Sequence, residues 1–296
     1  MFKGTYVFKQ LGKEIGRSNN IITNNGKKVI LQYLAGTRNN WAADLAIGAI
    51  PTTPTANDVE LNFETLRVPV NMKTFIYETS TNPNLIVVRG TIPANVYANI
   101  YEIGLYADTQ VSNVSLRDNR ILVEFSDLNN WITNSGVVNV IPYVPQAEFS
   151  PRIGGNSVEL ISNTVYSNSS YSFSLQGYSS IDTLQILAYN TVAGTLTITM
   201  SDTEGGNTSF SYVLNDNSDY QVLSVPFNPT DTYLGTINTV TFSTDSTAVI
   251  TIDTVKASTT AELTNNDYVI SKSVLETPIA KIYGVPLDIE YYVELL

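Results

Sequence analysis

Cysteine and histidine are both absent from this sequence of 296 residues, and their absence excludes several classes of site. Without them the chain has no Ser-His-Asp or Cys-His catalytic group, no imidazole or thiolate metal ligands and no disulfide bonds. It also lacks any run of about 20 apolar residues, the length that a membrane helix needs. These absences favour a structural or binding protein over an enzyme.

Positive charge is also scarce, because 16 Lys and Arg face 27 Asp and Glu and leave a net charge of -11. Nucleic-acid binding needs clustered Lys and Arg to neutralise phosphates, and anionic lipid attracts basic segments. The composition therefore predicts no nucleic-acid partner and no membrane partner. The residues after Met1–Thr5 do not form the hydrophobic core of a signal peptide, so we expect synthesis in the cytoplasm.

The distribution of charge divides the chain. No Lys or Arg lies between Arg152 and Lys256, although nine Asp and Glu do. The edges of this region fall near Pro145 and Ala257. We therefore predict a separate domain over residues 144–258, inserted into a domain formed by residues 1–143 plus 259–296.

The middle region reads as all-β. Thr195–Met200 alternates apolar and polar residues almost without exception, as a strand with one solvated face does. Turn clusters such as Gly205–Asn207 and Asn215–Asn217 separate the segments. The expected strands are Ser157–Thr164, Tyr171–Tyr178, Leu184–Val192, Thr195–Met200, Ser209–Leu214, Gln221–Phe227, Thr239–Ser243 and Ala248–Val255. Eight short strands predict a two-sheet sandwich of the jelly-roll kind.

The flanking regions indicate further strands and one short helix. Asn24 or Asn25 can cap the helix, Val29, Ile30, Tyr33 and Leu34 give it an apolar stripe, and Gly36 ends it. Strands are expected at Thr5–Phe8, Leu45–Ile50, Arg67–Tyr77, Leu85–Ile92, Ile100–Ala107, Ile121–Phe125 and Leu287–Tyr291, the last with an acidic, exposed face. The predicted fold class is mainly β: a split β-rich outer domain with one short helix, plus an inserted jelly-roll β-sandwich.

Four segments of the middle region resemble the jelly-roll carbohydrate-binding modules. They are Ile181–Ile186, Gly194–Ile198, Tyr220–Ser224 and Ile250–Val255. The resemblance implies a structural calcium ion, held by an Asp of the closing strand and an acid of the opening strand. Asp253 matches the first position, and Glu148 lies near the second, although Glu148–Phe149 reverses the family's Phe-Glu order. Calcium needs only oxygen ligands, and no other cofactor is expected. The alternative is that Asp253 is a solvated carboxylate at a strand end.

Sugar binding would need exposed aromatic rings, because the apolar face of a pyranose packs on a flat ring. The middle region has no Trp but several Tyr. Tyr166, Tyr178 and Tyr233 fall near predicted turns and are the candidate glycan contacts. Tyr189 and Tyr212 lie in apolar runs and are expected in the core.

Catalysis by carboxylates alone is chemically available to such a chain, since glycosidases use a pair of them. The acids here stand singly in turns and at strand ends. Glu102, between two apolar strand residues, is the one candidate for burial and a raised pKa, and its alternative is a solvent-facing position. We therefore expect that the protein is not an enzyme.

The outer domain resembles phage tail-fibre, baseplate and collar-type structural proteins. The matching elements are the helix after Asn24–Gly26, Ala46–Gly48 before a Pro/Thr loop, Phe63–Arg67, Ile100–Ala107, Leu275–Lys281 and Leu287–Leu295. The resemblance implies a non-enzymatic virion protein made in the host cytoplasm. It implies homo-oligomerisation, with a trimer as the leading expectation, and contacts to other virion proteins.

The inserted domain would then decorate the particle or contact host surface polysaccharide. Three alternatives remain open from the sequence. They are a capsid decoration or head-fibre protein, a non-viral protein with a carbohydrate-binding module, and a glycan-cleaving enzyme.

Overall fold

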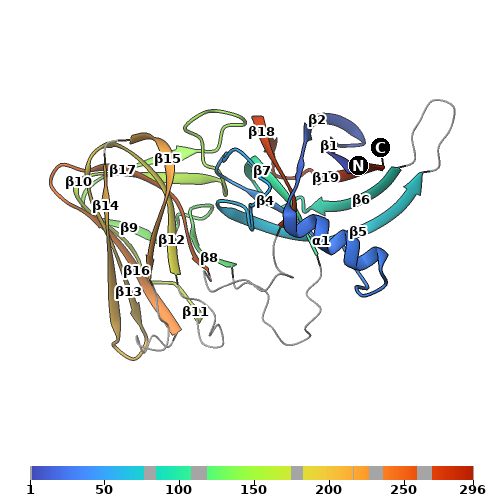
Figure 1. Cartoon of the computed structure of the whole chain (residues 1–296). Coiled ribbons are helices and arrows are strands. Elements are labelled where there is room, and N and C mark those ends of the chain that lie inside the picture. Colours follow the sequence, from blue (N-terminus) through green and yellow to red (C-terminus); the bar gives the residue numbers. More distant parts are fainter. Residues whose placement is uncertain are drawn as a thin grey trace. The chain divides into compact units, whose positions relative to one another are not determined.

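The structure is a computed structural model that describes residues 2–76, 85–107, 119–174, 183–215, 217–226, 236–258 and 269–295. The chain divides into two compact units (Figure 1). Unit 1 is drawn from Met1–Leu116, Pro145–Glu148 and Glu262–Leu296, and unit 2 from Arg117–Val144 and Phe149–Ala261. Among the described residues, no helix has the length and apolar character that crossing a membrane requires.

Unit 1 contains a nine-stranded sheet with the order β2-β1-β19-β6-β5-β4-β7-β18-β3. Its elements are β1 (Phe2–Gln10), β2 (Lys13–Asn19), β3 (Ile21–Ile22), α1 (Asn24–Leu34), β4 (Asp44–Gly48), β5 (Glu64–Ile76), β6 (Leu85–Ile92), β7 (Ala98–Tyr106), β18 (Val269–Lys281) and β19 (Leu287–Leu295). β2 and β3 stand at opposite ends of this order, yet only Asn20 separates them in sequence. The sheet therefore curls until its two ends meet.

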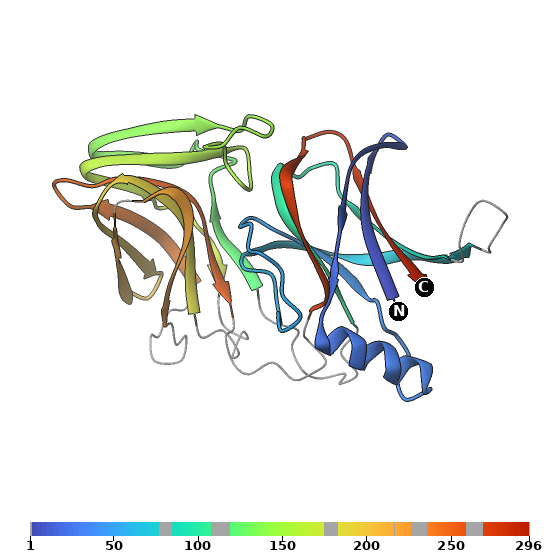
Figure 2. The same cartoon turned by 45° about the horizontal axis from the view of Figure 1, so that its top comes forward.

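The two ends of the chain pair with each other in unit 1. β1 and β19 are antiparallel neighbours over their whole length (Figure 2). Tyr6 and Phe8 on β1 point inward and are fully buried, as is Ile289 on β19. The ring of Tyr6 lies 4.6 Å from that of Tyr291, and the Tyr6 hydroxyl donates to the carbonyl of Ser271 on β18. The period-two pattern of these strands thus builds the core of unit 1.

Helix α1 is present, but its cap differs from the expected one. Thr23 is the N-cap, and its Oγ1 accepts a hydrogen bond from the backbone N–H of Gly26 at 2.9 Å. Thr23 rather than Asn24 takes the N-cap position, because its hydroxyl also donates to the carbonyl of Val269 and so connects the cap to β18. Val29 is buried, whereas Tyr33 and Leu34 of the predicted stripe are exposed.

The described residues of unit 2 form ten strands, and seven of them follow the order β14-β13-β16-β10-β17-β12-β15. Its strands are β8 (Asn119–Glu124), β9 (Trp131–Pro142), β10 (Asn156–Asn168), β11 (Phe173–Ser174), β12 (Thr183–Val192), β13 (Gly194–Asp202), β14 (Asn207–Leu214), β15 (Asn217–Pro226), β16 (Thr236–Thr244) and β17 (Val249–Ser258). Off this path, β8 pairs with β17, β9 with β10 and β11 with β16.

Strand β10 joins the two halves of the sandwich. Val158–Ile161 pairs with β17, and Val165–Asn168 pairs with β16. Between these halves Ser162 and Asn163 have positive φ angles of 31° and 53°, which bend the strand. Opposite the bend, Gly136 on β9 has φ of +75°, and a Cβ there would lie 2.3 Å from Thr164 Oγ1. Because of the bend, one strand pairs with β17 before Ser162 and with β16 after Asn163.

The predicted fold class is confirmed: the molecule is mainly β, with a single helix in the described segments and an inserted jelly-roll sandwich. The structure places residues 117–144 in unit 2, whereas we expected residues 1–143 in the outer domain. The reason is strand pairing, since β8 pairs with β17 and β9 with β10. The final strands, β18 and β19, pair with β7, β1 and β6 in unit 1.

Candidate functional site

Three neighbouring strands of unit 2 carry hydroxyl side chains on their outward face. On β13, Leu196, Ile198 and Met200 point inward and are fully buried. The residues between them point outward and pair across to β14 and β16. We call these outward Ser and Thr residues the hydroxyl face: Thr195, Thr197, Thr199, Ser201, Ser209, Ser211, Thr239, Thr241 and Ser243. Asn207 and Val213 complete the outward positions, so none of them is charged.

The hydroxyl face has hydrogen-bonding capacity to spare. Thr197 Oγ1 and Ser211 Oγ lie 3.1 Å apart, and Thr199 Oγ1 and Ser209 Oγ lie 2.8 Å apart. A hydroxyl offers one donor and two acceptor positions, so a single mutual bond leaves most of that capacity unused. Such a surface can bond to a neutral polyhydroxy ligand without a charge on either partner.

The predicted glycan tyrosines are not part of this face. Tyr166 is only 5% exposed, and its ring stacks on Trp131 with the centroids 4.8 Å apart. A ring that is buried in the core has no free face for a sugar. Tyr166 therefore does not have the exposed position that we expected. It is buried because β10 continues to Asn168 instead of turning near Tyr166. Tyr178 and Tyr233 lie outside the described residues.

In the described part of unit 2, the sequence reasoning missed one exposed ring. Phe149 is 44% exposed and contacts Tyr189, with the ring centroids 5.4 Å apart. Tyr189 itself is 6% exposed, as predicted for a core residue. An aromatic residue in the connection Pro145–Pro151, which begins and ends with proline, was the signal that could have found Phe149.

Asp253 on β17 is fully buried in unit 2, not solvated. Its Oδ2 accepts a hydrogen bond from the backbone N–H of Arg152 at 2.5 Å, while Oδ1 has no hydrogen-bond partner. Burial raises the pKa of Asp253 to about 8, although the backbone amides of Arg152 and Ile153 and the Arg152 guanidinium oppose this shift. The carboxyl group is therefore protonated over much of the neutral range.

The residues around Asp253 do not fit a calcium ion. Calcium requires six to eight oxygen ligands, usually with several carboxylates. Glu148, the expected second ligand, is exposed, whereas Asp253 is fully buried. The cation beside Asp253 is the Arg152 guanidinium, which repels a metal ion. In the described part of the chain, no three or more acidic side chains are grouped as a metal site would need.

Glu102 on β7 is also buried, contrary to the solvent-facing alternative. It is 0% exposed, and its Oε2 lies 3.1 Å from Nζ of Lys272 on β18. Burial raises the pKa of Glu102 to about 7, and Lys272 together with the N–H of Asn62 opposes the shift. Lys272 Nζ also lies 3.3 Å from Asp58. Glu102 also accepts from the N–H of Asn62, and Lys272 donates to the carbonyl of Glu60, so the cluster holds the loop before β5 against the sheet.

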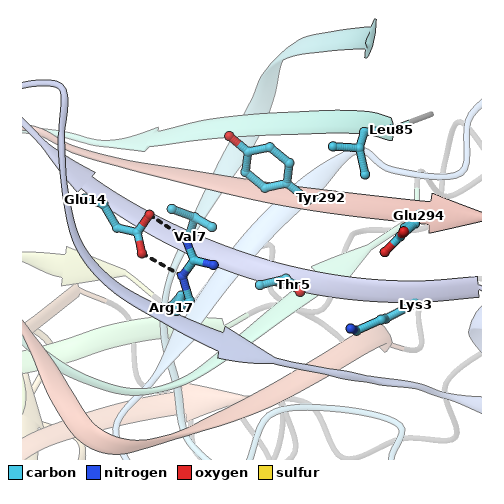
Figure 3. Close-up of a pocket in the computed structure, with 8 residues that line it drawn as sticks. All are labelled: Lys3, Thr5, Val7, Glu14, Arg17, Leu85, Tyr292 and Glu294. Atoms are coloured by element: carbon cyan, nitrogen blue, oxygen red, sulfur yellow. Dashed lines mark hydrogen bonds and ion pairs between the residues drawn. The ribbon is translucent and has the colours of Figure 1, made fainter. Parts of the chain in front are cut away.

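A cavity of about 430 Å³ lies on the outward face of β1, β2 and β19 in unit 1 (Figure 3). It is lined by Lys3, Thr5, Val7, Glu14, Arg17, Leu85, Tyr292 and Glu294. Two acids and two bases balance each other there, and Arg17 already holds both oxygens of Glu14, at 2.7 and 2.8 Å. The cavity therefore presents neither net charge nor a paired set of free carboxylates.

Next to this cavity, Glu290 on β19 is buried by two cations. Its Oε2 lies 2.6 Å from Lys9 Nζ and also accepts a hydrogen bond from the Tyr292 hydroxyl, while its Oε1 accepts one from Arg89 Nε at 2.9 Å. Burial opposes ionisation, but the hydrogen bonds from Lys9, Tyr292 and Arg89 outweigh it and lower the pKa of Glu290. The acid expected on an exposed face is thus covered, because long basic side chains from β1 and β6 fold over it.

Comparison with known proteins finds only distant structural similarities. No protein-family model matches the chain, and no curated protein matches it. A family 6 carbohydrate-binding module is 14% identical, with a TM-score of 0.31, over 44% of this chain and 87% of its own. A family 11 carbohydrate-binding module from Clostridium thermocellum, in complex with a mixed-linked tetrasaccharide, is 14% identical over 49% of this chain and 96% of its own, with a TM-score of 0.32.

A phage protein is also among the similar structures. The enzymatically active domain of tailspike protein 4 of bacteriophage CBA120 is 15% identical, with a TM-score of 0.32, over 46% of this chain and 20% of its own. Each of these similarities covers less than half of the chain. At such low identities and TM-scores they do not assign the chain to a family.

Proposed function

We propose that the protein is a non-enzymatic structural component of a bacteriophage particle, of the tail-fibre, baseplate or collar type. In this proposal unit 1 joins the particle, and unit 2 contacts neutral polysaccharide on the host surface through the hydroxyl face. Self-association of the chain is part of the proposal. No resident cofactor is required.

The observation that supports the proposed glycan contact is the hydroxyl face itself. Nine Ser and Thr side chains cover the outward positions of β13, β14 and β16, and no charged residue interrupts them. A net charge of -11 on the chain would repel an acidic polymer, whereas an uncharged face tolerates a neutral one. Hydroxyl groups on both sides match in hydrogen-bonding character.

The binding of one unit is expected to be weak. A hydrogen bond that replaces bonds to water contributes only about 0.5–1.5 kcal/mol, and this face provides no flat aromatic ring. Many copies on one particle would raise the overall affinity, because each further contact is made at high effective concentration. Weak single contacts are therefore compatible with attachment by a particle but poorly suited to an isolated binding protein. This favours the virion role over a non-viral carbohydrate-binding module.

The non-enzymatic part of the proposal is supported by the state of the buried acids. Glu102 and Glu290 are each in contact with cations, and Asp253 is held by backbone amides. A glycosidase needs two carboxylates that face one substrate bond across an open site. None of these three acids is available in that way.

The glycan contact is tested by affinity electrophoresis of the full chain in gels that contain neutral polysaccharides, such as a glucan or a galactan. The test variant combines Thr197→Val, Thr199→Val and Thr241→Val. Valine keeps the branched shape and the strand preference of threonine but removes the hydroxyl. The matched control is Thr74→Val on β5 of unit 1, an exposed strand position outside the hydroxyl face.

We expect the native chain and the Thr74→Val variant to be retarded by at least one neutral polysaccharide, and the triple variant to migrate freely. Retardation of the triple variant equal to that of the native chain would remove the hydroxyl face from the proposal. Failure of the native chain to bind any neutral polysaccharide would overturn the glycan contact. The virion role is tested separately: antibodies against the chain should label purified phage particles, and labelling of soluble protein only would contradict it.

A further inference from the structure

Strand β9 leaves one edge of the unit 2 sheet unpaired. It pairs with β10 along Trp131–Pro142, and no other described strand pairs with it. Ile132, Val137 and Val140 are 57%, 52% and 47% exposed, so apolar side chains line this edge. An exposed, apolar edge strand is a template for pairing with another strand. The hairpin of β9 and β10 is visible in Figure 2.

The backbone of β9 offers hydrogen-bonding groups at this free edge. The N–H of Val137 donates to Thr164 Oγ1 and the N–H of Tyr143 to the carbonyl of Gly155, so both point toward β10. Successive residues of a strand point their N–H groups to opposite sides. The N–H groups of Val138 and Val140 therefore point to the free edge. Pro142 follows the same alternation, and the N–H that it lacks would have pointed outward, as is usual for proline in an edge strand.

The edge strand itself carries no charge, although Glu159 on the neighbouring β10 accepts a hydrogen bond from Asn139 Nδ2 at 2.7 Å. Leu128–Ala147 contains no Asp, Glu, Lys or Arg, in a chain whose net charge is -11. Natural edge strands are commonly protected from pairing by charged side chains, above all lysine. A second copy of an acidic chain meets the least electrostatic repulsion where neither copy has charge. The neutral edge of β9 can therefore accept a second copy of this chain without charge repulsion between the paired strands.

The sequence Val137–Ile141 is also self-complementary in an antiparallel pair. Val138 and Val140 lie on the same face of the sheet as the buried Leu160 and Val158, with which they pair, although Val140 at the edge is still 47% exposed. Val137, Asn139 and Ile141 therefore lie on the outward face. If two copies pair about Asn139, Val137 faces Ile141, Val138 faces Val140, and Asn139 faces its own copy. Every pair then joins side chains of like character on the same face.

We propose that two copies of the chain associate through their β9 strands, antiparallel and centred on Asn139, so that one sheet runs through both copies. The Val138 and Val140 N–H groups donate to the carbonyls of Val140 and Val138 of the second copy. Asn139 sits at the twofold axis as a pair without backbone hydrogen bonds. Edge pairing of one strand with itself closes as a dimer. This inference rests on the self-association in the proposed function and gives it a surface and a symmetry.

The absence of cysteine from the chain makes a direct test available. In a pair without backbone hydrogen bonds, facing Cα atoms lie about 4.5 Å apart, which a disulfide can span. Asn139→Cys is therefore expected to form a covalent dimer under mild oxidation by oxidised glutathione, seen as a band of doubled mass on a non-reducing gel. Val137→Cys and Ile141→Cys are the matched controls, because each is a neighbouring outward position. Neither should crosslink alone, and a one-to-one mixture of the two should crosslink.

Sedimentation velocity of the native chain separates the two proposals, and circular dichroism confirms that each variant is folded. A native chain that stays monomeric at every concentration would contradict both the proposed self-association and the β9 pairing. An oligomer whose Asn139→Cys variant does not crosslink would overturn the β9 pairing alone. Equal crosslinking of Val137→Cys and Asn139→Cys would contradict the register. A trimer by sedimentation would contradict the twofold pairing.

Discussion

The two units satisfy their buried and capping acids in different ways. In unit 1 each of the two most deeply buried acids meets a cation from another strand: Glu102 meets Lys272, and Glu290 meets Lys9 and Arg89. In unit 2, Asp202, Asp245 and Asp253 are held mainly by hydrogen bonds from backbone amides. Asp202 accepts from the N–H groups of Glu204 and Gly206 within its own turn.

Asp245 and Asp253 follow the same rule in unit 2. Asp245 accepts from the N–H groups of Thr195, Thr247 and Ala248, and the first of these bonds does most to lower its pKa. Asp253 accepts from the N–H of Arg152. The cause is compositional, because no Lys or Arg lies between Arg152 and Lys256. A region with almost no cations must hold its acids with backbone N–H groups and hydroxyls.

The largest expected effect is in unit 1. Lys272→Met leaves Glu102 buried without its cation, and breaking a buried pair in this way costs about 3–5 kcal/mol. The free energy of unfolding, measured by urea denaturation, should fall by that amount. Lys27→Met, at an exposed position of α1, is the control and should change little. A similar small loss in both variants would show that the buried pair is not important for unit 1.

A pH-dependent effect is expected in unit 2. The pKa of Asp253 is raised from 3.8 to about 8 by burial, so the folded state disfavours its ionised form. Its contribution therefore makes the free energy of unfolding fall as pH rises between about 4 and about 8, by up to about 1.4 kcal/mol per pH unit.

Asp253→Asn should remove that slope and leave unit 2 more stable than the native protein at pH 9. Urea denaturation at several pH values, followed through the fluorescence of Trp131, measures it. An unchanged slope in the variant would contradict the assignment.

A smaller effect is expected at Glu290. Glu290→Gln leaves Lys9 and Arg89 close to each other without the acid between them, and the loss of charged hydrogen bonds should cost about 1–3 kcal/mol. Because the pKa of Glu290 is lowered in the folded state, its stabilisation is present above the ordinary pKa of 4.5 and is lost as pH falls through the lower, folded value. The variant should therefore lose less stability on acidification than the native protein. Glu14→Gln, which breaks only the exposed pair with Arg17, should change stability by less than about 1 kcal/mol.

The smallest expected effect is that of metal removal. Because the surroundings of Asp253 do not fit calcium, addition of a chelator should leave the thermal midpoint of unit 2 unchanged. Addition of excess calcium should not raise the midpoint either. A rise of several degrees with calcium, reversed by the chelator, would show that a cation binds unit 2 after all.

Local patterns in the sequence predicted much of the fold. Thr195–Met200 became the centre of β13, because period-two alternation needs no knowledge of partners. The helix followed from its stripe and Gly36, but the choice of cap did not. Thr23 was selected over Asn24 by a contact with Val269, which lies 246 residues away. Non-local contacts of this kind leave no mark in a local pattern.

The candidate site was harder to predict for the same reason. Glu102 lies on β7, which is buried on both faces, so its polar character gave no indication of Lys272 far along the chain. Tyr166 was expected at a turn, but the bend at Ser162 and Asn163 carries β10 on into the second sheet and buries the ring. The outward Thr and Ser of single strands were visible. The order of the strands in the sheet brings the outward Thr and Ser of β13, β14 and β16 together into one face, and the sequence does not reveal that order.

The most direct test of the two-unit account uses the two tryptophans, because Trp41 lies in the core of unit 1 and Trp131 in that of unit 2. Urea unfolding is followed by fluorescence in the Trp131→Phe and Trp41→Phe backgrounds, each combined with Lys272→Met or Asp253→Asn. The account predicts that Lys272→Met shifts only the transition reported by Trp41, and that Asp253→Asn shifts only the one reported by Trp131. A single transition that both substitutions move equally would contradict it.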